Sequence, residues 1–424
     1  MPDPVSSLPG ADDITEVTLP NGITILTRPN FNSPSVVINA YLHAGSIFDP
    51  DDKLGLANFT VAALMHGTRQ RSHLEIYEAL EAVGASLGFD AAIHIVGFNG
   101  KALAEDLDLL LELASECLRE PDFPEDEIER IRARILTGLA LRAQNPESMA
   151  SLTFDQIVYR GHPYSRPEDG HPDTVRNISR EDMRAFHRRF FGPRGMVVVV
   201  VGGVEPAQAI EKVSRVFGDW QNSGQPEMAT LPPLRPLDGN LHRQAFIPGT
   251  SQSSIVMGVA GPPRNAPGFL AASLGNNVLG QFGMYGRIGE AVREKSGLAY
   301  YAYSSLSGGV GPGPWYFVAG VAPDNVERTI DLIRGEIERF IRQGISEEEL
   351  ADSKANYIGR LPLSLESNAG VSAALISLKR YGLGLDYYRT YADRVNAVTR
   401  EEILEVARQY LDPEKLAIAV AGPK

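Results

Sequence analysis

The fold is decided by a stretch that occurs twice, first as Ser179-Arg-Glu-Asp-Met183, Phe191-Gly-Pro193 and Val197–Gly202, and again, 220 positions later, as Thr399-Arg-Glu-Glu-Ile403, Leu411-Asp-Pro413 and Ala417–Gly422. Ser179 with Asp182, and Thr399 with Glu402, have the spacing of a capping box, which predicts the start of a helix. An apolar run closed by glycine predicts a buried strand. The chain therefore contains two copies of one unit.

The same offset aligns the front of the two units. Val36–Ala40 is aligned with Val256–Ala260, and each run is expected to be a strand followed by a loop and a helix. The stretch Gln221–Asn240 is rich in proline and poor in apolar anchors, which is typical of a stiff linker. We therefore expect a first domain over residues 1–220, a linker over 221–240 and a second domain over 241–424.

The secondary structure expected in the first half begins with a hairpin. Alternating and β-branched residues predict three strands, at Glu16–Leu19, Thr24–Arg28 and Val36–Ala44. Two helices are expected next, at Leu54–Met65 and Leu74–Val83, followed by a strand region at Leu87–Asn99. Two longer helices follow at Leu103–Leu118 and Glu125–Ala143. Asn21-Gly22 is the turn between the first two strands. This order predicts the α+β class: two homologous tandem α/β sandwich domains, each a mixed sheet with helices packed on one face.

Composition excludes several kinds of function. The chain has 424 residues and a formal net charge of −13, which argues against nucleic acid and anionic membranes as partners. The single cysteine, Cys117, rules out an internal disulfide and a cysteine-built metal site. No apolar run is long enough to span a membrane, and Met1–Asp13 lacks the pattern of a secretion signal. We expect a cytoplasmic protein, or a periplasmic one if a signal peptide has been removed.

The segment Gly55–Thr68 resembles the active-site helix of the pitrilysin/insulinase-type zinc peptidases, which include the mitochondrial processing peptidase. The resemblance covers almost the whole chain through the tandem halves, the Asn21-Gly22 hairpin, the His66-Gly-Thr68 end of the helix, the loop His162–Pro167 and the helix that starts at Pro124. It implies two subunits of two domains each, closed around a chamber that admits unfolded peptides. It also implies that peptide is captured by strand addition at a sheet edge.

The family motif on this helix is His-x-x-Glu-His, in which two histidines bind zinc and the glutamate acts as general base. The matching positions hold Asn58, Val61 and Ala62, and the distal glutamate ligand falls near Thr137-Gly138. None of these residues supplies a histidine or a carboxylate, and none of the eight histidines forms a pair at i and i+4. The sequence therefore predicts a degenerate zinc site at Asn58, Val61, Ala62 and Gly138, and no metal or other cofactor in this chain.

The second half keeps another family element, Arg293 and Tyr300 within Arg293-Glu-Lys-Ser-Gly-Leu-Ala-Tyr300. The resemblance implies that such a pair faces the metal, where it binds the substrate carbonyl or stabilises an oxyanion. Gly297 is expected to end the helix in a left-handed conformation, with Tyr300 starting the next strand. The alternative is structural: an exposed arginine that ends a helix and a core tyrosine that opens a strand.

Two other features are weaker candidates. The run Gly308–Gly313 lacks the lysine and hydroxyl residue of a phosphate loop, so we expect a hairpin loop. Tyr387, Tyr388 and Tyr391 could line a peptide groove, although an aromatic cluster is more often core.

The leading hypothesis is a non-catalytic subunit of a heterodimeric zinc peptidase, inactive alone. A homologous partner would bring zinc and the His-x-x-Glu-His motif, while this chain would bring Arg293 and Tyr300 to a bound peptide or unfolded polypeptide. A second hypothesis is a structural or assembly subunit of the same fold, in which both residues are dispensable. A third is an independent enzyme with a relocated metal site, for example near His162 and His171, although two loop histidines make a poor site.

Overall fold

The computed structural model of the protein describes residues 8–283 and 286–424. The chain forms two compact units that are interleaved in sequence. Unit 1 comprises Met1–Leu139, Pro167–Thr230 and Pro362–Arg389, and unit 2 comprises Ala140–Arg166, Leu231–Leu361 and Thr390–Lys424. Each unit has its own mixed sheet and its own hydrophobic core.

Unit 1 is built on a six-stranded sheet in the order β1-β2-β6-β3-β5-β4. Its strands are β1 Thr15–Thr18, β2 Thr24–Pro29, β3 Ser35–Leu42, β4 Ser86–Ala91, β5 Val96–Leu103 and β6 Val197–Gly202. Neighbouring strands are antiparallel except β2 and β6, which are parallel. Its helices are α1 Leu56–Ala62, α2 His73–Ala82, α3 Leu107–Arg119, α4 Glu125–Arg142, α6 Pro172–Asn177, α7 Arg180–Phe190, α8 Pro206–Phe217 and α13 Asn368–Tyr381.

Unit 2 repeats this plan with five strands in the order β7-β11-β8-β10-β9. Its strands are β7 Leu241–Phe246, β8 Ser253–Ala260, β9 Ala299–Leu306, β10 Pro314–Val321 and β11 Ala417–Gly422. Only β7 and β11 are parallel. Its helices are α5 Pro146–Val158, α9 Phe269–Gly280, α10 Gly286–Gly289, α11 Val326–Gln343, α12 Glu347–Ser364, α14 Tyr391–Ala397 and α15 Arg400–Tyr410, with a π-helical turn at Glu290–Glu294.

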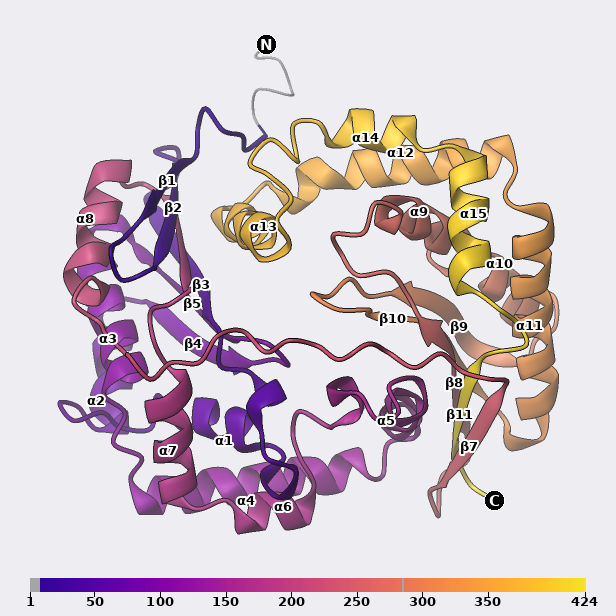
Figure 1. Ribbon diagram of the computed structural model, residues 1–424, viewed down its shortest axis with the longest axis horizontal. Helices are drawn as coiled ribbons and strands as arrows, with labels where there is room; N and C mark the ends of the chain where they lie inside the picture. The colour runs from indigo at the N-terminus through magenta and orange to yellow at the C-terminus, as the bar shows by residue number, and fades with distance from the viewer. Residues whose placement is uncertain (1–7, 284–285) are drawn as a thin grey trace. The chain divides into compact units, whose positions relative to one another are not determined.

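The core of each unit lies between the sheet and its main helices. In unit 1, α3 and α8 cover one face, and Figure 1 shows them on the side of the sheet opposite to α13. In unit 2, α9, α11 and α15 cover one face of the sheet. No helix in the described part of the chain is long and apolar enough to cross a membrane.

The second face of each sheet carries one helix from the opposite half of the sequence. Helix α5 packs on β11, β8 and β7 in unit 2, whereas α13 packs on β6 and β3 in unit 1. Asn368, at the start of α13, accepts a hydrogen bond from Asn30 (2.7 Å) and donates one to the carbonyl of Ser35 (3.1 Å). The two sequence halves have thus exchanged equivalent helices. The domain boundary expected at residues 221–240 describes the repeat, and it stays a prediction.

The α+β class with two tandem copies is confirmed, and so are both capping boxes and the Asn21-Gly22 turn, where Gly22 has φ 93°. The alignment of Val36–Ala40 with Val256–Ala260 is wrong by three residues. Tyr41 pairs with Val197, and Gly258 pairs with Ala417. The closing strands are thus 220 positions apart, whereas the front strands are 217 apart. A slip of three residues exchanges the two faces of a strand, but both front strands are largely buried on both faces, so their apolar runs do not reveal the register.

Candidate functional site

Helix α1 carries Asn58, Val61 and Ala62, the positions aligned with the zinc motif, and its first turn is held by a buried carboxylate. Asp49 accepts hydrogen bonds from the backbone N–H groups of Gly55 and Ala57, both at 2.9 Å. Gly55 has φ 94°, and a Cβ there would lie 2.8 Å from the carbonyl oxygen of Asp169. A left-handed conformation and a close backbone approach both require glycine. The helix is therefore well anchored even though its motif is absent.

The four positions that match the zinc motif cannot hold the metal. Asn58 donates a hydrogen bond to Asp169 (2.7 Å), so its amide is already engaged. Val61 is 4% exposed and belongs to the core of unit 1, and Ala62 packs against that core. Gly138 lies exposed on α4 and carries no side chain. Zinc needs nitrogen, sulfur or carboxylate ligands, and this set offers none.

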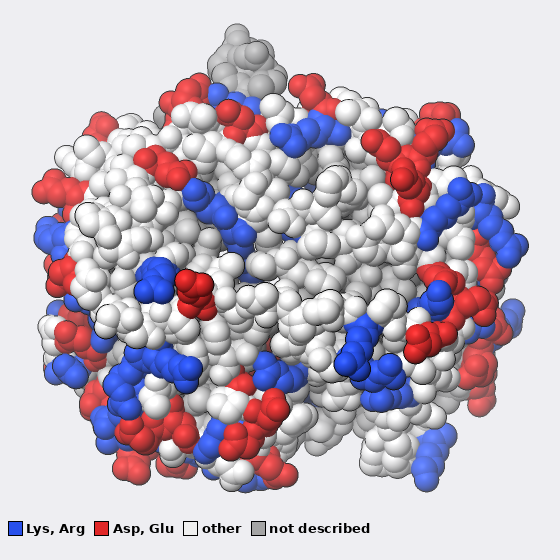
Figure 2. Space-filling view, in the orientation of Figure 1, with Lys and Arg blue, Asp and Glu red and all other residues white. Residues whose placement is uncertain are grey.

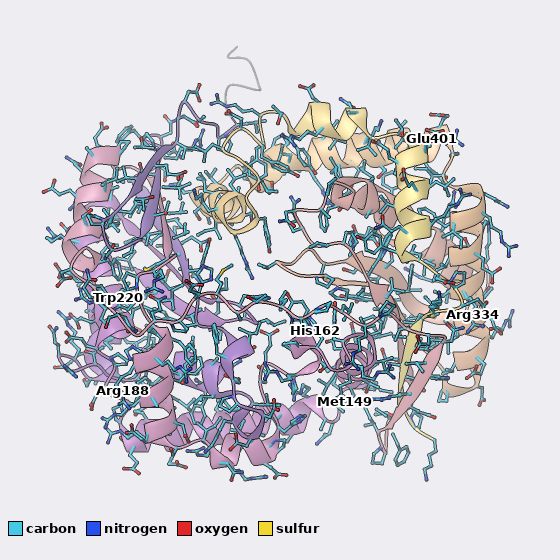
Figure 3. All side chains as sticks on the ribbon, in the orientation of Figure 1. Met149, His162, Arg188, Trp220, Arg334 and Glu401 are labelled. Carbon is cyan, nitrogen blue, oxygen red and sulfur yellow. The ribbon has the colours of Figure 1, made fainter. Side chains whose placement is uncertain are left out.

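No other metal site replaces it among residues 8–283 and 286–424, where no group of three or more His, Cys, Asp or Glu side chains is arranged to hold a metal ion. His162 is buried after α5, where Figure 3 labels it, and its Nδ1 accepts a hydrogen bond from the N–H of Tyr164 (3.2 Å). His171 is the N-cap residue of α6. Both histidines thus have local structural roles, which disfavours the relocated metal site.

Arg293 lies in the π-helical turn that follows α10. The N–H of Lys295 donates to the carbonyl of Glu290 (2.9 Å), a bond that spans one residue more than in an α-helix. Gly297, with φ 62°, then ends the helix through a bond from its N–H to the carbonyl of Arg293 (3.0 Å). The left-handed C-cap predicted at Gly297 is confirmed. Isolated π-helical turns are rare and occur frequently at functional sites.

Tyr300 lies at a second irregularity, on the edge strand β9. Ala299 pairs with Val321 and Tyr301 pairs with Gly320, so Tyr300 has no partner on β10. Such a one-residue bulge re-aims a side chain, and bulges are over-represented beside active sites. The side chain is 84% exposed, which rules out the alternative of a core tyrosine. Both residues of the Arg293–Tyr300 pair therefore sit at interruptions of regular structure.

The weaker candidates have structural roles. The loop Gly308–Gly313 joins β9 to β10 as the predicted hairpin, and the N–H of Gly311 donates to the hydroxyl of buried Tyr164 (3.1 Å). Tyr387 is buried and packs edge-on against Tyr388, with ring centroids 5.4 Å apart. Figure 2 shows acidic and basic side chains interspersed over the visible face.

A group of titratable residues in unit 1 was not predicted. Tyr41 lies near the end of β3 and His43 just after it; Asp90 comes from β4, Glu168 from the loop before α6, and Arg380 from α13. Burial, and to a lesser extent the neighbouring Asp169, raise the pKa of Glu168 to about 7 against the opposing effect of Arg380. Burial also raises the pKa of Tyr41 to about 12 and lowers that of His43. We call these five residues the Arg380 cluster.

Comparison with known proteins identifies the family. Residues 24–168 match the profile described as insulinase (peptidase family M16), and residues 177–357 match the one described as peptidase M16 inactive domain. The chain belongs to peptidase family M16. The insulinase profile thus covers the helix with Asn58, Val61 and Ala62, and the inactive-domain profile covers Arg293 and Tyr300.

Relatives that match over most of their own length support the assignment. A Streptomyces coelicolor protein named uncharacterized zinc protease is 26% identical over 98% of this chain and 90% of its own length. A Mycobacterium tuberculosis protein of the same description is 28% identical over 96% of this chain and 92% of its own length. The crystal structure of a peptidase M16 inactive domain from Pseudomonas fluorescens superposes with a TM-score of 0.90 at 26% identity, covering 97% of this chain and 98% of that one. A protease from Helicobacter pylori shares the fold, with a TM-score of 0.90 at 21% identity over 98% of this chain and all of that one.

Proposed function

We propose that this M16 chain is the non-catalytic subunit of a heterodimeric zinc peptidase that degrades or processes peptides in an enclosed chamber. A homologous partner brings the zinc ion, its ligands and the general base. This chain brings Arg293 and Tyr300 to the substrate bound at the partner's zinc.

The observation that carries the proposal is the contrast between the two halves. Asn58, Val61, Ala62 and Gly138 provide no zinc ligand and no base. Arg293 lies in a π-helical turn and Tyr300 lies at a β-bulge. Both features interrupt regular hydrogen bonding, and both are frequent at functional sites, where they change the direction of a side chain. Because both features are enriched at functional sites, they favour a functional use of the pair.

The chemistry of the pair suits a peptide carbonyl. The guanidinium of Arg293 is partly exposed, with 33% of its side chain accessible, and the hydroxyl of Tyr300 is carried by a side chain that is 84% exposed. Both groups donate hydrogen bonds, and donors aimed at a developing oxyanion stabilise the transition state. The edge strand β9 carries Tyr300 and has a free edge to which an extended peptide can add as a further strand.

The test is a peptidase assay with a fluorogenic peptide on this chain alone, on a homologous chain that carries His-x-x-Glu-His, and on their mixture. We expect activity from the mixture that a chelator abolishes, and none from this chain alone. Arg293→Ala and Tyr300→Phe should each lower kcat of the mixture by about a hundred- to a thousandfold, the range for loss of one oxyanion donor.

Two matched variants control for surface changes. Lys295→Ala removes a neighbouring exposed cation, and Tyr77→Phe removes the hydroxyl of an exposed tyrosine in unit 1. Both should leave kcat unchanged. Chelator-sensitive activity from the purified chain alone would refute the proposal. Full activity of the mixture with both Arg293→Ala and Tyr300→Phe would instead favour the structural or assembly subunit.

A further inference from the structure

Arg380 is a partly buried cation that forms no salt bridge with any residue that the structure describes. Its Nε is buried and has no hydrogen-bond partner among the described residues, and its guanidinium carbon lies 5.5 Å from the ring of Tyr381. The adjacent Lys379 is different, because its ammonium group forms an ion pair with Glu16 at 2.7 Å. A guanidinium removed from water needs a hydrogen-bonding anion to offset the loss of hydration.

The sheet on which α13 packs carries a row of polar side chains. Asp90 on β4 is opposite Gly97 on β5, which is opposite Tyr41 on β3, so the three residues form one row on the same face of the sheet. Gly97 has no side chain, and the Asp90 carboxylate leans over it, 2.8 Å from where a Cβ would lie. Helix α13 packs on β3 and β6, and β4 is the far edge of the sheet. The row therefore runs from the helix that carries Arg380 to a free strand edge.

The charges around Arg380 favour a carboxylate as the anion. Asp90 and Glu168 both act on Arg380 electrostatically, yet neither forms a salt bridge with it in the described part of the chain. Asp169 already accepts a hydrogen bond from Asn58. A doubly charged phosphate would be repelled by these acids, whereas a single carboxylate can share a proton with Glu168 and accept two parallel N–H bonds from the guanidinium.

We infer that Arg380 is the anion-binding group of a carboxylate site on the α13-bearing face of unit 1, and that the site takes a carboxylate of a bound peptide. The carboxylate comes from the C-terminus or from an acidic side chain. Asp90, Tyr41, His43 and Glu168 each interact electrostatically with Arg380, and Glu168 donates a proton to the bound carboxylate when it is neutral. The inference rests on the proposed function only for the peptide nature of the ligand.

The test is fluorescence anisotropy of labelled peptides on the full-length chain alone. Three ten-residue Ala/Gly/Ser peptides are compared: one with a free C-terminus, one amidated, and one amidated with a central glutamate. We expect at least one carboxylate-bearing peptide to bind about tenfold or more tightly than the plain amide. The peptide that gains affinity identifies which carboxylate is bound.

Arg380→Gln should abolish this preference, whereas Lys379→Gln, the adjacent cation with its own partner, should keep it. Glu168→Gln provides a second variant, because a carboxamide cannot ionise. In the native chain the affinity should fall by about threefold or more between pH 6 and pH 8 as Glu168 loses its proton, and in Glu168→Gln it should stay level.

Equal binding of all three peptides, or no binding of any at millimolar concentration, overturns the inference. A preference that persists in Arg380→Gln overturns it as well. The assay needs neither partner nor catalysis, so its failure is distinguishable from failure of the proposed peptidase role.

Discussion

Removal of the Asp49 carboxylate should loosen helix α1 selectively. Asp49 is 3% exposed and accepts two backbone hydrogen bonds at the start of the helix, from Gly55 and Ala57. Asp49→Ala leaves both donors buried without this acceptor. Alanine also cannot replace the negative charge at the positive end of the helix.

The magnitude follows from those two bonds. A hydrogen bond to a charged group contributes about 1.5 kcal/mol or more, so losing two costs about 3 kcal/mol. Because each tenfold change corresponds to about 1.4 kcal/mol, local opening of α1 should become about a hundredfold more frequent.

Native-state hydrogen exchange measures this opening directly, because it reports local unfolding free energies. Amides of α1 should exchange about a hundredfold faster in Asp49→Ala, while those of α9 in unit 2 serve as the internal reference. Asp52→Ala, at an exposed position three residues further on, is the matched control and should change neither helix. Unchanged protection of α1 in Asp49→Ala would show that the carboxylate does not hold the helix and would refute the reasoning.

Three further outcomes are expected. Asn276→Ala removes the side-chain oxygen that accepts hydrogen bonds from buried Trp315 (2.9 Å) and Ser304 (2.7 Å). The free energy of unfolding of unit 2 should fall by about 3 kcal/mol, measured by guanidinium titration with tryptophan fluorescence. A loss below about 1 kcal/mol would contradict this expectation. Burial lowers the pKa of His187 to about 4. Between about pH 6.5 and pH 4 this histidine is therefore protonated in the unfolded chain but neutral in the folded one. The free energy of unfolding should fall by about 3 kcal/mol as the pH drops through that window. His187→Phe should flatten this slope, and an unaltered slope would exclude His187 as its source. The purified chain should contain far less than one zinc per molecule by mass spectrometry, and EDTA should leave its Tm unchanged; stoichiometric zinc with a chelator-dependent Tm would contradict the degenerate site.

Local chemistry made the repeat predictable. The capping boxes at Ser179 and Thr399 and the closing strands at Val197 and Ala417 are set by neighbouring residues, so their patterns survive in the sequence. That Asn58, Val61 and Ala62 are neither histidines nor carboxylates is a matter of residue identity, and the loss of the zinc site stays a prediction. The π-helical turn at Arg293 has no comparable signal, because the residues that form it are ordinary helix formers.

Long-range packing set the limit of prediction. The pattern of α13, with Val371, Leu375 and Leu378 buried, indicates one apolar face but not the sheet that receives it. The Arg380 cluster depends on that choice, since His43 and Arg380 are more than 300 positions apart and meet only because α13 packs in unit 1. The three-residue slip at Val256 has the same origin, because strand pairing and not the apolar run determines the register.

The helix exchange sets the order in which the newborn chain can finish folding. Strand β6 ends at Gly202, but the helix that covers it and β3 ends only at Tyr381, about 180 residues later. At translation rates of about 5–20 residues per second, the apolar face of β6 stays without its covering helix for roughly ten to forty seconds after the strand is synthesised. Helix α5 has the opposite history, since it leaves the ribosome before any strand of its sheet exists. Neither sheet can therefore have both faces covered by helices from its own half of the chain. Unit 1 can finish folding only after the last third of the chain has been synthesised.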